Sequence, residues 1–163
     1  MKKQTILTIL LSIGLVFLSH TASFGEGFEH IKRLFELRES IGEQGRTLPT
    51  LIRSASGNDI RTLERIFELN TSALTTIEAY FRIFKMAIST QNMQDPATIL
   101  ILDEWLTFMG TQCKFDIEYL DEASSGDRDQ EILKQINLSK KNIIELSTIA
   151  KIGVKENQMP TEE

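Results

Sequence analysis

The sequence predicts an all-α protein: an up-and-down antiparallel four-helix bundle, with a kinked first helix, preceded by a signal peptide. Apolar residues recur at helical spacing in four segments of similar length, and short turn sequences separate these segments. Only 3 of the 163 residues are proline, and few runs alternate β-branched with polar residues, which argues against an all-β fold. Helices of matched length joined by short connections pack antiparallel to their neighbours.

Residues 1–25 have the organisation of a secretory signal peptide. Lys2 and Lys3 precede an apolar run over 6–18, and small residues follow the run. The run is shorter than the ~20 residues that a membrane-spanning helix needs. We expect cleavage after Gly25, with cleavage after Ser23 or an uncleaved anchor as alternatives. The double-lysine start and the compact apolar run favour the bacterial periplasm, with extracellular secretion as the alternative.

Residues 26–155 form the predicted bundle domain, and residues 156–163 a flexible C-terminal tail. The first helix, 26–56, has the least regular pattern, and Pro49 predicts a kink that divides it into two pieces. The second helix, 58–91, has a heptad seam, meaning apolar positions spaced alternately four and three residues apart. That seam consists of Leu63, Phe67, Asn70, Leu74, Ile77, Phe81, Phe84 and Ile88. We expect Asn58 or Asp59 to cap the start of this helix.

The third helix opens with Asp95 as the cap and Pro96 at the first helical position. Its inner seam consists of Leu102, Leu106, Met109, Cys113, Asp116, Leu120 and Ala123. Asp127 or Asp129 starts the last helix, whose inner face contains Ile132, Ile136, Ile143, Ala150 and Val154. Acids dominate the third helix and lysines the fourth, which favours the two as neighbours, although each exposed ion pair contributes only about 0–1 kcal/mol.

The sequence lacks the residue patterns of known catalytic or metal sites, so neither catalytic nor metal-ligating residues are predicted. The single cysteine, Cys113, lies on the inner seam and is expected to be buried and inert. No Glu-x-x-His pair of the di-iron type is present. His30 with Met109 could in principle ligate haem, but we expect an exposed His30 and a core Met109, and we predict no cofactor.

The third helix is too apolar for an ordinary surface helix. A second stripe runs beside its inner seam and consists of Ile101, Trp105, Phe108, Gln112, Phe115 and Tyr119. Tyr80, Ile83 and Ala87 form a similar stripe at the end of the second helix. Two interpretations stay open: a wide aromatic core, or an exposed patch that binds a protein partner or a second copy. For the second, the candidate residues are Tyr80, Ile83, Trp105 and Phe108.

Asn70 and Asp116 are the polar members of two adjacent seams. Folding the chain back about the turn near residue 92 brings them to similar heights in the bundle. We therefore expect a buried polar pair that fixes the register of the helices, with a ligand or proton site as the alternative.

The predicted function is non-enzymatic. We expect an exported protein that acts by protein–protein interaction, as an adaptor, chaperone, inhibitor or immunity-type protein. The alternative is a carrier that holds a small ligand or cofactor in the bundle interior. With 23 acidic against 18 basic residues and a net charge of −5, the composition argues against a nucleic-acid-binding protein, which would need a basic face. After signal cleavage we expect no stable membrane insertion.

Overall fold

The computed structural model describes residues 28–125 and 128–157, which form four α-helices and contain no strand. The helices are α2 (Glu29–Ser54), α3 (Asn58–Ser89), α4 (Pro96–Ser124) and α5 (Gln130–Asn157). The predicted signal peptide and most of the predicted tail lie outside the described residues. The helical architecture predicted for the bundle domain is thereby confirmed, and α5 reaches two residues beyond the predicted end of the domain.

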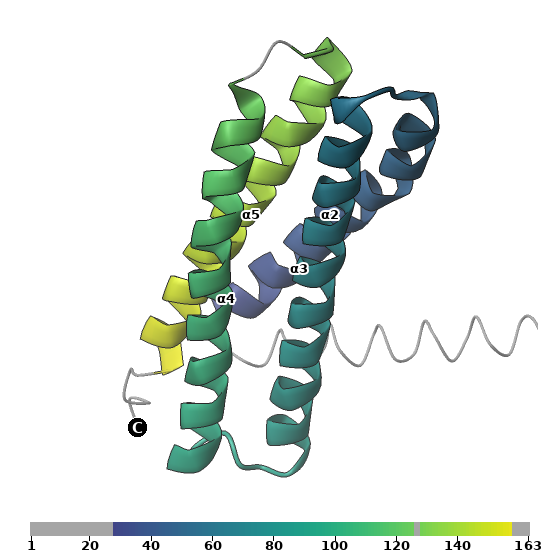
Figure 1. Ribbon diagram of the computed structural model, residues 1–163. Helices are drawn as coiled ribbons and strands as arrows, with labels where there is room; N and C mark the ends of the chain where they lie inside the picture. The colour runs from purple at the N-terminus through teal and green to yellow at the C-terminus, as the bar shows by residue number, and fades with distance from the viewer. Residues whose placement is uncertain (1–27, 126–127, 158–163) are drawn as a thin grey trace, which may run out of the picture.

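The four helices run alternately up and down, and α2 crosses the others at an angle (Figure 1). Both α2 and α4 pack against α3 and α5, and α3 also contacts α5 directly, while the backbones of α2 and α4 stay apart. The α4–α5 interface is the most extensive one, and α3 approaches α4 less closely. The short connections place each helix beside the next, because a few residues can only turn the chain back on itself.

The inner face of α4 matches its predicted seam completely. All seven seam residues, from Leu102 to Ala123, are buried. Asp95 also caps this helix as predicted, because its Oδ2 accepts a hydrogen bond of 2.9 Å from the amide of Thr98. Cap and proline together fix where the helix starts, and the seam fixes which face turns inward.

The inner face of α3 differs from the prediction. Half of the predicted seam is buried, but the other buried positions lie one residue earlier than expected: Ile66, Ala73, Tyr80 and Ala87 replace Phe67, Leu74, Phe81 and Ile88. Phe81 instead lies at the α2 side, where its ring stacks on Phe35 with 4.3 Å between centroids. The prediction was wrong here because α3 has apolar residues on both sides of its seam, and packing against α2 and α5 decides between them.

Pro49 does not divide the first helix. α2 continues as a helix through Pro49, so the two pieces expected there form one helix, and the kink stays a prediction. α3 has no side-chain cap, since Gly57 precedes its first residue and Asp59 pairs with Arg128 at 2.9 Å. At the start of α5, Asp129 accepts a hydrogen bond of 2.8 Å from the amide of Glu131.

One glycine permits a close approach of three helices. A Cβ on Gly153 of α5 would lie 2.7 Å from Leu106 Cδ1 of α4 and 3.0 Å from the ring of His30 of α2. Real Cβ atoms essentially never approach another atom to 2.7 Å, and 3.0 Å is already tighter than most Cβ contacts. Glycine therefore lets α2, α4 and α5 meet at this end of the bundle, where His30 bonds to Glu156 and Tyr80.

Candidate interaction surface and buried polar groups

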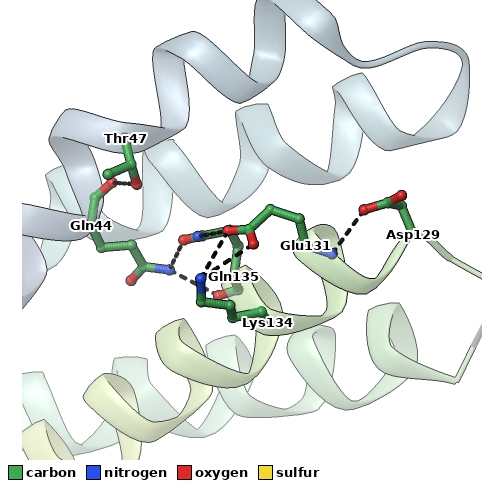
Figure 2. A network of polar contacts seen from close by, with 6 residues as sticks. All are labelled: Gln44, Thr47, Asp129, Glu131, Lys134 and Gln135. Carbon is green, nitrogen blue, oxygen red and sulfur yellow. Dashed lines mark hydrogen bonds and ion pairs between the residues drawn. The ribbon is translucent and has the colours of Figure 1, made fainter.

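A buried layer of polar side chains connects α2, α3 and α5. Gln44 of α2 lies at its centre and is 2% exposed. Its amide nitrogen donates to the backbone oxygen of Gln135 at 2.8 Å, and its side-chain oxygen accepts from Asn70 at 3.1 Å and from Asn142 at 3.3 Å. Ser139 donates to Asn70 Oδ1 at 2.9 Å. Figure 2 shows Gln44 of α2 reaching Gln135 of α5, which in turn donates to Glu131.

Among the described residues, every buried side-chain nitrogen or oxygen has a hydrogen-bond partner. This matters because an unsatisfied buried polar group destabilises a fold by about 1–3 kcal/mol. The polar layer fixes the relative heights of α2, α3 and α5, since a shift of any one helix would break several of these bonds at once.

The predicted polar pair is buried, but its members have separate partners. Asn70 bonds to Gln44 and Ser139, whereas Asp116 accepts from Gln112 on its own helix at 3.5 Å. The described residues show no hydrogen bond between Asn70 and Asp116. The polar layer was missed in the sequence because its centre, Gln44, lies in the irregular first helix.

Asp116 lies at a narrow cleft between α3 and α4. Ser72, Ala73 and Thr76 of α3 line the cleft opposite Gln112 and Asp116 of α4. Its volume of about 20 Å³ holds one water molecule at most. Burial raises the pKa of Asp116, an effect that the hydrogen bond from Gln112 and the charge of Arg65 partly offset.

We expect Asp116→Asn to raise the free energy of unfolding near pH 7 by roughly 1 kcal/mol, because it removes a desolvated charge. The raised pKa means that the folded state binds the proton more tightly than the unfolded chain. The free-energy cost of burying the ionised carboxylate therefore shrinks as the pH falls towards 3.8. The stability that Asp116→Asn gains over the parent disappears with it. Urea unfolding at several pH values measures this. The exposed Glu118→Gln on the same helix is the control, and equal pH profiles for Asp116→Asn and the parent would contradict the expectation.

His30 is fully buried, contrary to the expected exposed position. Its Nδ1 bonds to the carboxylate of Glu156, and its Nε2 lies 2.9 Å from the hydroxyl of Tyr80. A carboxylate only accepts hydrogen bonds, so Nδ1 carries the proton; in the neutral ring, which burial favours, Nε2 accepts from Tyr80. Burial lowers the pKa of His30, and Glu156 counteracts this. The prediction failed because Glu156, 126 residues away in the chain, supplies the partner.

The contacts of His30 also test whether His30 and Met109 could ligate a haem. Met109 lies in the core as predicted. Both ring nitrogens of His30 are engaged by Glu156 and Tyr80, which leaves no lone pair for an iron atom. These two residues therefore do not fit a haem.

Cys113 is buried, and burial raises its thiol pKa to about 12. Within the ranges described, no group of three or more His, Cys, Asp or Glu residues is placed to hold a metal ion.

The second stripe of α4 lies on the outside of the bundle and is called the outer seam here. Ile101, Phe108 and Phe115 are 46%, 55% and 64% exposed. Trp105 and Tyr119 are half-buried and pack against the core, and the rings of Trp105 and Phe108 meet edge to face with 6.2 Å between centroids. With the exposed Gln112, the outer seam keeps alternating spacings of four and three over its whole length.

The outer seam borders α3. Arg65 of α3 lies over the ring of Tyr119 at 5.8 Å, and Ser72 shares the cleft with Gln112. This antiparallel register places Ala79 level with Trp105. We call the row Ser72, Thr76, Ala79 and Ile83 the α3 edge; its exposed and half-buried side chains are mostly small.

The four predicted interaction residues differ in how far the structure exposes them. Phe108 is exposed, and Trp105 and Ile83 are half-buried at the α3–α4 border. Tyr80 is fully buried, bonds to His30 and stacks on Phe84, so it offers no surface. The residues that the candidate list omitted, Phe115 and Ile101, are among the exposed apolar side chains of α4.

An acidic row flanks the outer seam on its solvent side. Glu104, Glu118 and Glu122 are exposed and lie between the outer seam and the back of the helix by helical spacing. In the part of the chain that the structure describes, none of the three forms an ion pair. Arg65, across the border on α3, is paired with Glu68 at 3.0 Å.

Comparison with protein families, with curated proteins and with solved structures finds no match for this chain. Of the helices described, none combines the length and the apolar character that crossing a membrane requires.

Proposed function

We propose that this protein is exported and acts by binding another protein through the outer seam of α4, without catalysis of its own. The observation that carries the proposal is the exposure of Ile101, Phe108 and Phe115 in one continuous heptad seam. Single exposed apolar residues are ordinary, but contiguous apolar patches on soluble proteins mark sites of interaction. Aromatic side chains are also enriched at the centres of such interfaces.

The interior offers less support for the alternative carrier function. The α3–α4 cleft has room for one water molecule, and His30 has no free ring nitrogen. The predicted signal peptide supports export, and the periplasm is the proposed location, with cleavage expected after Gly25. Adaptor, chaperone, inhibitor and immunity-type roles all agree with a bundle that presents one apolar seam.

Photo-crosslinking tests the proposal. A photoreactive phenylalanine analogue replaces Phe108 in cells that export the protein, and Ile144, an exposed residue of α5, carries the analogue in the control. We expect a discrete adduct from position 108 and none from position 144. Phe115→Ser, in the same seam, should reduce the yield at position 108 at least about tenfold, as loss of an interface anchor does. Equal labelling from both positions, or no adduct at either, would overturn the proposal.

A further inference from the structure

We infer that the partner presents a basic amphipathic α-helix, which lies lengthwise along the outer seam of α4 beside the α3 edge. This inference rests on the proposed function and names the chemical class of the partner. Three observations carry it: the spacing of the outer seam, the size of the side chains on the α3 edge, and the acidic row.

The spacing of the outer seam selects a helix. Positions spaced alternately four and three residues apart keep facing one neighbouring helix, because that neighbour can wind around them at 3.5 residues per turn. The seam extends from Ile101 to Tyr119, which is roughly 27 Å of helix. A strand or a loop could not match this repeat along its whole length.

The α3 edge has low relief beside the outer seam. Ser72 and Thr76 carry short side chains on the side of α3 that faces α4, and the antiparallel register adds Ala79 to this row. α3 also approaches α4 less closely than α5 does. A helix seated there would contact both α3 and α4, and its apolar residues would cover Trp105 and Phe108 while its backbone passes above the small residues of α3.

The acidic row selects the charge of the partner. Glu104, Glu118 and Glu122 are exposed beside the seam and have no ion-pair partner among the described residues. Lysine or arginine at the flanking positions of a docked helix would meet them, as charged flanking residues do in paired helices. A second copy of this protein is a poor occupant, because seam-to-seam pairing would bring two acidic rows together.

Two synthetic peptides test the inference on the full chain. Each is roughly three heptads long, with leucine at the seam positions; one has lysine at the flanking positions and its twin has glutamate. Trp105 is the only tryptophan of the protein, so its fluorescence reports binding at the outer seam when the peptides contain none. We expect the lysine peptide to shift the emission to shorter wavelength, gain helicity and bind at least about tenfold more tightly than its twin.

Matched variants localise the effect. The triple variant Glu104→Gln, Glu118→Gln, Glu122→Gln should weaken the lysine peptide about tenfold. The variant Glu36→Gln, Glu39→Gln, Glu64→Gln removes the same charge from exposed positions of α2 and α3 and should leave its affinity unchanged. Sedimentation of the protein alone should show a monomer; a dimer that Phe108→Ser dissociates would identify a second copy as the occupant and overturn the inference.

The remaining outcomes separate the inference from the proposed function. Equal binding of both peptides would overturn the basic partner, while crosslinking at position 108 would still support an interaction surface. If neither peptide binds and position 108 nevertheless forms a discrete adduct, the partner is not a basic helix. If position 108 forms no adduct either, the proposed function fails as well.

Discussion

Replacing Gln44 by leucine is expected to lower the free energy of unfolding by about 3–5 kcal/mol. Leucine is close to glutamine in size, so the loss arises from hydrogen bonds and not from a cavity. The variant leaves the side-chain amides of Asn70 and Asn142 without their acceptor and the backbone oxygen of Gln135 without a side-chain donor. Each of the two asparagine amides, left unsatisfied in the interior, destabilises by about 1–3 kcal/mol, whereas the Gln135 oxygen keeps its bond within α5.

Urea unfolding followed by circular dichroism measures this loss. Glu43→Leu, at the neighbouring exposed position, should change stability by less than about 0.5 kcal/mol. The double variant Gln44→Leu, Asn70→Leu should lose less than the sum of its single variants, because it removes both partners of one bond. A Gln44→Leu protein as stable as its parent would show that the polar layer contributes nothing to stability.

His30→Ala is expected to destabilise the protein by about 2–4 kcal/mol. The variant leaves a cavity where the ring packed against Phe28 and Phe84. It also removes a hydrogen-bond partner from the buried hydroxyl of Tyr80 and from Glu156. Thermal unfolding at pH 7 measures the effect, and Lys32→Ala, two residues along the same helix and exposed, is the control. An effect as small as that of Lys32→Ala would contradict the buried cluster.

The same residue makes stability depend on pH. Burial lowers the pKa of His30 from 6.5 in the folded state, so the unfolded chain binds the proton more readily. The free energy of unfolding contributed by this group is complete above pH 6.5 and decreases as the pH falls below it. The difference in stability between the parent and His30→Ala should therefore narrow as the pH falls from 7 to 5. Asp116 has the opposite pH trend, but it is present in both proteins and cancels.

The sequence alone predicted those features that depend on one helix. The inner seam of α4 and its Asp95 cap were correct because periodicity and capping are local. The inner face of α3 was half right, since Phe67 and Ile66 are equally apolar and only packing against other helices decides which turns inward.

Features that join distant parts of the chain could not be predicted in the same way. His30 looked like a surface residue because nothing near it in sequence could satisfy its ring. The polar layer brings Gln44 together with Ser139 and Asn142 from another helix, which no local pattern specifies. A signal was nevertheless present, since Ser139 falls between Ile136 and Ile143 on the inner face of its helix.

α4 has two apolar faces side by side, and either face has the spacing needed to pack into the bundle interior. The outer seam repeats the inner one with a displacement of a single residue, so a turn of about 100° around the helix axis would interchange them. The polar layer anchors α2, α3 and α5 but does not reach α4, whose rotation depends on its packing against α5 and on the contacts of Asp103 with Asn157 and of Asp121 with Lys140. A ligand that occupies the exposed face would remove the competing orientation, so the arrival of a partner would lock this helix in place.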